Sequence, residues 1–514
     1  MQNRRDQVQA HMFVMGRLTS GLLRTDLDAP ESPVGRTNRG LAIGIIVSLL
    51  VAAGAFIMGL ISPAGSNSWR AEGTLIVDED TGSRYFYDNG ELRPVLNYAS
   101  AKLLAGESGS GLTSKTVATE SLRGTPRGLP VGITGAPDVL PDAGALAKPR
   151  PWLVCSAPAD GAGTKATVLS VASDARQRPL PGGSALLVAD PSGGRHLVWQ
   201  GARLRIDSES SALEGLGYGS ATPREVSAAF VDALPAGPDL APAAVAGLGR
   251  TGPSFGSLAT RIGQVFRTTV PGAERGQYYL LTQEGLTPLT NTQAALQLSA
   301  PQTARKAYDG KPAQARDLEP GVLKGQLAPG VAGAAAGGAA GLPESPPKLA
   351  GVAEEQGVCS SVTPGSPSGS GVRVGVALVG QDALGPVAKR SETGVAAACL
   401  AVDAVVVGPG EGALVQAGSA AGGAIGGSRY LVTDTGVKHR LPGEGDASAL
   451  GYGAREVGTV PSLLLSMLPT GPDLGAGAAA VAPKTGENSP KPVCGSREAT
   501  KSKASASPSR GTAE

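Results

Sequence analysis

Residues 41–61 read LAIGIIVSLLVAAGAFIMGLI, a run without one charged side chain. Roughly 20 such residues in a helix span the hydrocarbon core of a bilayer, about 30 Å thick, and a helix satisfies its own backbone hydrogen bonds where no water is present. The arm before the run is longer than the basic segment of a typical cleaved signal peptide, and no small-x-small cleavage site follows the run. We therefore predict a membrane anchor, a transmembrane helix over residues 41–62.

The arm that precedes the span, residues 1–40, predicts how the helix is oriented. Lys and Arg close to a first span tend to remain in the cytoplasm, and the arm holds Arg4, Arg5, Arg17, Arg24, Arg36 and Arg39. We expect a single-pass protein of the cell membrane, with a cytoplasmic amino terminus and a large extracytoplasmic carboxy-terminal part.

The arm is itself expected to be an amphipathic helix. Apolar residues recur near helical spacing at Val8, Phe13, Val14, Leu18, Leu22 and Leu23. Such a helix either lies on the lipid bilayer or docks against a partner. The alternative is a solvated arm with an incidental apolar stripe.

Composition limits the remaining choices. The chain has 514 residues, enough for several domains, but its 75 Gly, 40 Pro and only 4% aromatic residues argue against large compact cores. The formal net charge is +2, and no basic stretch is interleaved with aromatic residues, so we exclude nucleic acid as a partner.

Repeated sequence blocks organise the exported part. LGYG occurs at 216–219 and 450–453, and LPAGPDL at 234–240 corresponds to LPTGPDL at 468–474. Upstream of these blocks, a predicted strand, turn and strand at 185–190 and 193–196 matches another at 430–434 and 436–439. Two weaker copies occur at 74–78 with 82–85, and at 277–282 with 285–288, and Asp88-Asn89-Gly90 is a further expected hairpin turn.

Each repeat is expected to be a small α+β module. Helical spacing is found at Val226, Ala229, Phe230 and Leu234. The preceding Thr222-Pro223-Arg224-Glu225 predicts a capping box with proline at the first helical position. The equivalent helix of the last copy is expected over residues 461–468.

Short β-prone runs between the modules predict one discontinuous central β domain. They are residues 152–155, 166–171, 372–379, 401–407 and 413–416. Low-complexity stretches at 329–347 and 363–371 interrupt it, and the tail from residue 483 is expected to be disordered.

The predicted fold class is α+β: a single amino-terminal transmembrane helix, then an elongated exported part with the discontinuous central β domain and four small α+β repeats. The expected boundaries after the span are repeat 1 at 69–145, the central β domain at 151–180 and 355–420, repeat 2 at 184–242, repeat 3 at 255–326, an Ala/Gly/Pro-rich linker at 327–350, repeat 4 at 428–476 and the tail at 483–514.

Residues suited to catalysis are scarce. A P-loop requires G-x-x-x-x-G-K-[ST], and the nearest string, Gly161-Ala162-Gly163-Thr164-Lys165, lacks that spacing. We therefore predict no catalytic, cofactor-binding or metal-binding residues and no cofactor, with ATP as the alternative.

The histidines and the repeated tyrosines are expected to be structural. The three histidines are His11, His196 and His439. The last two are expected at one position of the repeat, where the first copy has Tyr85. A position that accepts Tyr or His indicates packing rather than a general base. Tyr218 and Tyr452 are likewise expected to pack over tight turns, with glycan stacking as the alternative.

Several motifs occur together in this chain: the arm QNRRDQVQAH at 2–11 with Arg17-Leu18, the single span, PRG at 126–128 followed by GITGAPD at 132–138, and the paired LPxGP blocks. In this combination the chain resembles the EccB family of the actinobacterial type VII (ESX) secretion system. The resemblance implies a structural scaffold subunit for protein export, associated with EccC, EccD and EccE type membrane subunits and with further copies of itself.

The resemblance also leaves two alternatives. Some family members carry an ATPase label, so ATP hydrolysis is one alternative. Because no P-loop is present here, we expect that the chain is not an enzyme. Cell-wall (peptidoglycan) binding by the repeats is the other alternative.

The chain has four cysteines, Cys155, Cys359, Cys399 and Cys494, and no Cys-x-x-Cys pair. In an exported domain this pattern favours disulfides over a metal site. Cys155 and Cys359 border segments of the central β domain, and the family's equivalent cysteines imply their pairing. A second disulfide between Cys399 and Cys494 is left open, because Cys399 could instead be a buried thiol and Cys494 a free one.

Overall fold

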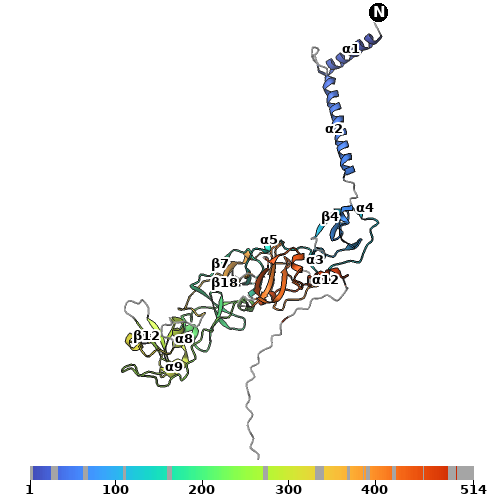
Figure 1. Cartoon of the computed structure of the whole chain (residues 1–514). Helices are drawn as coiled ribbons and strands as arrows, with labels where there is room; N and C mark the ends of the chain where they lie inside the picture. Colours follow the sequence, from blue (N-terminus) through green and yellow to red (C-terminus); the bar gives the residue numbers. More distant parts are fainter. Residues whose placement is uncertain are drawn as a thin grey trace, which may run out of the picture. The chain divides into compact units, whose positions relative to one another are not determined.

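The computed structural model (Figure 1) describes residues 4–24, 33–61, 67–107, 112–158, 165–269, 276–329, 341–366, 371–385, 387–388, 394–419, 424–454, 457–483 and 494. It forms two units. One comprises Met1–Leu92 and Thr113–Arg127, and the other Arg93–Leu112 and Gly128–Glu514. Most of the expected tail, and parts of the arm, the linker and the 363–371 stretch, lie outside the described residues.

The first unit begins with two long helices, α1 (Arg4–Arg24) and α2 (Pro33–Ile61). Within α2, Thr37–Met58 is long and apolar enough to cross a membrane, and none of it is buried; it is the single such helix in the described part of the chain. The helix starts before the predicted Leu41, at Pro33, where proline suits the first helical position.

A four-stranded sheet completes the first unit. Its order is β3-β2-β1-β4, in which β1 (Thr74–Asp78) pairs antiparallel with β2 (Arg84–Asp88) and parallel with β4 (Thr113–Val117). Asn89 and Gly90 both have positive φ, 50° and 79°, and connect β2 to β3 (Glu91–Pro94) in the predicted two-residue turn. The core contains Trp69 from η1 (Asn67–Trp69), Ile76, Tyr85, Leu92, and Leu122 from α4 (Thr119–Leu122).

Three further sheets repeat this strand order. They are β10-β9-β8-β11 in repeat 2, β14-β13-β12-β15 in repeat 3 and β22-β21-β20-β23 in repeat 4, each with its last strand parallel to its first. The bounds are β8 (Ser184–Ala189), β9 (Arg195–Trp199), β10 (Ala202–Arg205), β11 (Arg224–Glu225), β12 (Val265–Thr268), β13 (Gln277–Thr282), β14 (Gly285–Leu289), β15 (Arg316–Asp317), β20 (Ala413–Gly418), β21 (Ala424–Val432), β22 (Lys438–Leu441) and β23 (Val457–Pro461). Repeat 2 gains β16 (Lys348–Leu349) beside β8.

Helices connect the third strand of each repeat to the fourth, or follow the fourth. The connecting helices are α3 (Tyr98–Glu107), α6 (Ala212–Gly215), α8 (Asn291–Ser299) with α9 (Pro301–Ala307), and α10 (Asp446–Ala449). Those that follow are α4, α7 (Ala228–Asp232), η2 (Pro320–Leu323) and α11 (Ser462–Ser466). The strand, turn and strand segments expected in all four copies are therefore present.

Our superposition of the repeats was wrong by one strand. Residues 185–190 and 193–196 belong to the β8–β9 hairpin, the first of its repeat, whereas 430–439 contains β21 and β22, the second hairpin. The pair at 277–288 is also a second hairpin, β13–β14. The error arose because β12 and β20, the true first strands, were not recognised as parts of their repeats.

Three local predictions were also wrong. Residues 413–416, expected in the central β domain, belong to β20, which pairs with β21 and β23 of repeat 4; a β-prone run does not specify its partner strand. Arg224 and Glu225 form β11 rather than a capping box, and Ser227 caps α7 by accepting a hydrogen bond from the Phe230 backbone N–H. Pro461 ends β23, so the last helix starts at Ser462.

The central sheet is assembled from distant segments. Its order is β19-β6-β5-β17-β18-β7, with β5 (Trp152–Pro158), β6 (Lys165–Ser170), β7 (Gln177–Pro179), β17 (Gln356–Thr363), β18 (Arg373–Gly380) and β19 (Ala404–Val406). Trp152, Val154 and Val362 pack with residues of repeat 4, and Val358 packs with residues of repeat 2. Leu153, Cys155 and Cys359 form a separate cluster with Val379 and Leu384.

Neighbouring repeats meet through their short helices. In the second unit α6 packs against α8, and α3 packs against α10 and α12 (Ala476–Ala480). Figure 1 shows the labels of α3 and α12 side by side. A methyl group built on Gly106 would lie 2.2 Å from the Ala449 Cβ, and one on Gly215 would lie 2.3 Å from the Ser299 Oγ. Glycine is therefore required where these helices cross.

Candidate functional surfaces

The arm helix α1 exposes the apolar side chains that the sequence singled out. Val8, Phe13, Val14, Leu18 and Leu22 are each more than half exposed, as are Met12 and Met15; the side chain of Leu23 lies outside the described residues. Val8, Met12, Met15 and Leu22 share one face because three to four residues make one helical turn. This face is available to a lipid surface or a protein partner.

The LPxGPDL blocks close one edge of a sheet. The backbone N–H of Arg203 donates to the Pro235 carbonyl oxygen at 2.9 Å, and that of Gly237 donates back to Arg203 at 2.9 Å. The equivalent bonds in repeat 4 join Lys438 to Pro469 at 3.0 Å and Gly471 to Lys438 at 2.9 Å. Because an unpaired sheet edge invites unwanted strand pairing, these blocks serve the fold rather than a ligand.

An ion pair accompanies each of these blocks. Arg205 lies 3.8 Å from Asp239 in repeat 2, and Arg440 pairs with Asp473 in repeat 4. The aspartate of each Gly-Pro-Asp therefore holds the arginine at the end of the neighbouring strand.

The repeated tyrosines are buried, with 6% of Tyr218 and 4% of Tyr452 exposed. Each hydroxyl donates to a proline carbonyl oxygen, that of Pro347 at 2.6 Å and that of Pro141 at 2.9 Å. Burial raises the pKa of Tyr218 to about 12 and raises that of Tyr452 as well. This agrees with the predicted packing role, since a buried ring offers no face for a sugar.

The two exported histidines occupy different strands, contrary to our placement. His196 lies on β9, and its Nε2 is 3.0 Å from Asp190. His439 lies on β22, and its Nδ1 donates to the Pro472 carbonyl oxygen at 3.0 Å. Burial lowers the pKa of His439 to about 4, and only 3% of the residue is exposed. Both imidazole rings are buried, which agrees with the predicted packing role of the two histidines. The argument that they share one position of the repeat was wrong.

Asp190 accepts several hydrogen bonds in addition to its contact with His196. Its oxygens accept from the Ser192 hydroxyl at 2.5 Å and the Gly194 backbone N–H at 3.0 Å as well as contacting His196. Although partial burial acts in the opposite direction, these hydrogen bonds hold its pKa at about 2. The Asp190–His196 pair thus fixes the turn between β8 and β9.

Two lysines are held by backbone carbonyl groups. Lys438 donates from Nζ to the Leu465 carbonyl oxygen, and burial lowers its pKa to about 8. Lys102 donates to the Leu450 carbonyl oxygen at 2.8 Å, and burial lowers its pKa too. Lys102 thereby joins α3 to the end of α10.

Neither a metal site nor a phosphate loop is formed by the residues that the structure describes. Within the described ranges, no group of three or more His, Cys, Asp and Glu side chains is placed to hold a metal ion. Of the phosphate-loop-like string, Gly161 to Thr164 lie outside the described residues, and Lys165 begins β6.

The four cysteines lie in two close pairs. Cys155 and Cys359 face each other directly across the antiparallel strands β5 and β17, with their sulfur atoms 2.07 Å apart. Cys399 and Cys494 have sulfur atoms 2.01 Å apart. The first pair joins the two halves of the central sheet, and the second ties the segment after repeat 4 back to the segment before it.

The chain matches a known protein family over almost its whole length. The family model described as "Type VII secretion system ESX-1, transport TM domain B" matches residues 2–485. The protein named ESX-3 secretion system ATPase EccB3 of Mycolicibacterium smegmatis is 30% identical over 498 residues, which cover 93% of this chain and 90% of that one. Its namesake in Mycobacterium tuberculosis is 30% identical over 314 residues, 57% of this chain and 55% of the relative.

Solved structures share the fold. The structure of the EccB3 dimer from the ESX-3 core complex matches with a TM-score of 0.61 and 27% identity, covering 79% of this chain and all of the other. A chain of the periplasmic assembly from the ESX-5 inner membrane complex matches with a TM-score of 0.60 and 25% identity, covering 83% of this chain and 99% of the other.

Proposed function

Because this chain belongs to the EccB family of type VII secretion systems, we propose that it is an extracytoplasmic scaffold subunit of a membrane complex that exports proteins. The observation that carries the proposal is the family match over residues 2–485, a range that includes the span, the repeats and the central sheet. The EccB3 dimer structure, all of which is covered, supports it. The titratable groups described above hold turns, strands and helix ends together, which suits a structural protein.

The partners follow from the relatives. We propose that α2 anchors the chain beside EccC, EccD and EccE type membrane subunits and that the exported part contacts further copies of this chain. The solved relatives are a dimer and part of an inner membrane complex. The exposed apolar face of α1 is the proposed cytoplasmic contact, on the bilayer or on a partner.

Two experiments test the scaffold role. A reporter active only outside the cytoplasm should work when fused after Ala71 and stay silent when fused at Gly40. Deleting residues 1–38 while keeping the span should release the chain from its membrane partners and stop secretion, measured by native pull-down after detergent extraction. The full chain recovered alone, or secretion unaffected by the deletion, would contradict the proposal.

The curated relatives carry ATPase in their names, and we propose that this chain does not hydrolyse ATP. In support, the sequence has no P-loop, whose backbone N–H groups and lysine neutralise the phosphates. The test is ATP turnover by the purified full chain beside its Lys165→Ala variant. Turnover that survives removal of contaminating ATPases and is lost in that variant would overturn the proposal.

Cell-wall binding is the second candidate, and no observation favours it. The aromatic side chains of the repeated blocks, Tyr218 and Tyr452, are buried and offer no ring face to a sugar. Co-sedimentation of the full chain with isolated cell wall is the discriminating measurement.

A further inference from the structure

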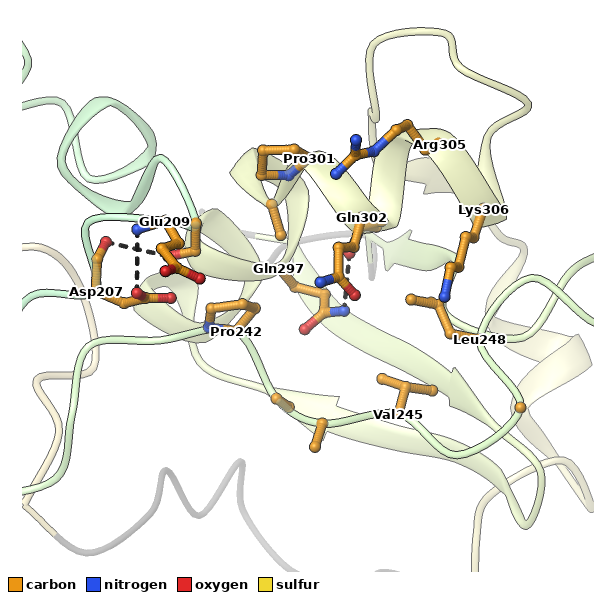
Figure 2. A pocket seen from close by; sticks show the side chains of 16 residues that line it. Asp207, Glu209, Pro242, Val245, Leu248, Gln297, Pro301, Gln302, Arg305 and Lys306 are labelled. Carbon is orange, nitrogen blue, oxygen red and sulfur yellow. Dashed lines mark hydrogen bonds between the residues drawn. The ribbon is translucent and has the colours of Figure 1, made fainter.

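A cavity of about 710 Å³ lies where repeat 2 meets repeat 3 (Figure 2). Three chain segments line it. They are 207–210 after β10, 242–248 in the connection between the two repeats, and 297–306 at the end of α8 and in α9. Both repeats therefore contribute to its walls, and neither forms the cavity alone.

One buried polar atom at this cavity has no partner. The Gln297 Nε2 donates to the Thr303 Oγ1 at 3.1 Å, whereas the Gln297 Oε1 accepts no hydrogen bond from any residue that the structure describes. Only 2% of Gln297 is exposed. In Figure 2 its terminal amide lies in the space between Pro242 and Val245. A buried acceptor without a donor is costly, so this atom indicates a ligand with an N–H or O–H group.

Charged groups of opposite sign lie at opposite ends of the cavity. Figure 2 shows Asp207 and Glu209 on one side and Arg305 and Lys306 on the other. Asp207 accepts from the Glu209 backbone N–H at 3.1 Å, which fixes its carboxylate in a turn. Within the described residues, neither Arg305 nor Lys306 forms an ion pair. These charges complement a ligand that is itself positive at one end and negative at the other.

The surface between the charged ends is apolar. Pro242, Val245 and Leu248 line it, and Figure 2 shows the Lys306 side chain directed toward Leu248. Small apolar side chains of a ligand would cover this floor. The volume is within the range of small-molecule sites, about 300–1,000 Å³, and accommodates a short peptide.

We propose that this cavity binds a short peptide with free ends. Its amino group would lie at Asp207 and Glu209, its carboxylate at Arg305 and Lys306, and a backbone N–H would donate to the Gln297 Oε1. A peptide bound in this way contacts repeats 2 and 3 together and holds them in one arrangement. The inference does not depend on the scaffold role.

The test uses the full chain in lipid nanodiscs and tri-alanine as the probe, with binding measured by ligand-detected NMR and calorimetry. We expect saturable binding by tri-alanine with free ends. N-acetylation and carboxy-terminal amidation should each weaken binding at least threefold, because each removes one charge. No saturable binding, or equal binding of all three peptides, would overturn the proposal.

Matched variants locate the site. Lys306→Gln should weaken tri-alanine binding at least threefold, whereas Lys311→Gln, an exposed lysine outside the cavity lining, should not. Gln297→Met should abolish binding, with thermal unfolding as the check on its fold. If Gln297→Met does not fold, the comparison of Lys306→Gln with Lys311→Gln still tests the location of the site. Equal binding of tri-alanine by these two variants would refute the location.

Discussion

The hydroxyl group of Tyr218 donates a 2.6 Å hydrogen bond to the carbonyl oxygen of Pro347, a residue that lies 129 positions further along the chain. Tyr452 makes the equivalent bond to Pro141, 311 positions earlier. In both repeats the buried tyrosine of the Gly-Tyr-Gly block thus holds a segment that is distant in the sequence against the module. The recurrence of the block is explained by this tertiary bond rather than by a ligand.

Replacing either tyrosine by phenylalanine tests this role. Tyr218→Phe and Tyr452→Phe should each lower the free energy of unfolding by about 1–2 kcal/mol, because a buried carbonyl oxygen loses its donor. Denaturant unfolding of the full chain in detergent is the measurement. Tyr279→Phe is the control, because the Tyr279 hydroxyl makes no hydrogen bond to any residue that the structure describes. Loss of carbohydrate binding without a change in stability would instead support glycan stacking.

The sequence predicted the hairpins better than their place in each module. Strands joined by tight turns, such as β8–β9 at Gly193-Gly194 and β2–β3 at Asn89-Gly90, are local and were recognised. The first strands β12 and β20 were not assigned to their repeats, although each pairs antiparallel with the next strand, β13 or β21, and parallel with a later one, β15 or β23. Periodicity carries no information on such partners.

Among the candidate sites, too, those that depend on neighbouring residues were predicted and those that depend on distant segments were not. The burial of Tyr218 and Tyr452 followed from glycines on both sides of each ring, a local signal. The Gln297 cavity had no signal in the sequence, because segments from two repeats must meet before the unpaired oxygen is visible. The prediction that His196 and His439 share one position of the repeat was an error of alignment. The strand pairing shows that they lie on different strands of their repeats, β9 and β22.

The helix crossings at Gly106 and Gly215 are expected to tolerate no side chain. Gly106→Ala places a methyl group 2.6 Å from the Ala449 Cα, a backbone atom that cannot move aside cheaply. We expect a loss of about 1–3 kcal/mol in unfolding free energy, the usual cost of overpacking. Gly477→Ala is the matched control in α12, where nothing lies within 4 Å of the new methyl group. There the substitution should be neutral or stabilise by up to about 1 kcal/mol.

Non-reducing peptide mapping should recover two linked pairs, Cys155 with Cys359 and Cys399 with Cys494. Free thiols at Cys155 and Cys359, or either joined to Cys494, would contradict the arrangement of β5 beside β17. The first bond closes a loop of 204 residues and the second one of 95. In the chain-entropy model each stabilises by about 5 kcal/mol, and measured values are often smaller. The Cys155→Ala/Cys359→Ala double variant should therefore lose about 2–5 kcal/mol.

His439 makes the stability of repeat 4 depend on pH. Its pKa is about 4 in the folded chain and 6.5 in an unfolded one, so between these values the unfolded state binds more protons. The free energy of unfolding should then fall as the pH drops from about 6.5 to 4. The total is about 3 kcal/mol, from about 1.4 kcal/mol per unit of pKa. Above pH 6.5 both states are neutral at this site and the contribution is complete.

The measurement is unfolding of the full chain as a function of pH, with His439→Gln as the test variant. Glutamine keeps an N–H group for the Pro472 carbonyl oxygen and does not titrate, so the decline between pH 6.5 and 4 should become shallower. His11→Gln, on the exposed helix α1, controls for loss of a histidine elsewhere. A methyl group on Gly471 would lie 2.3 Å from the His439 Cε1, so Gly471→Ala should displace the ring. An unchanged pH dependence in His439→Gln would show that other groups cause the decline.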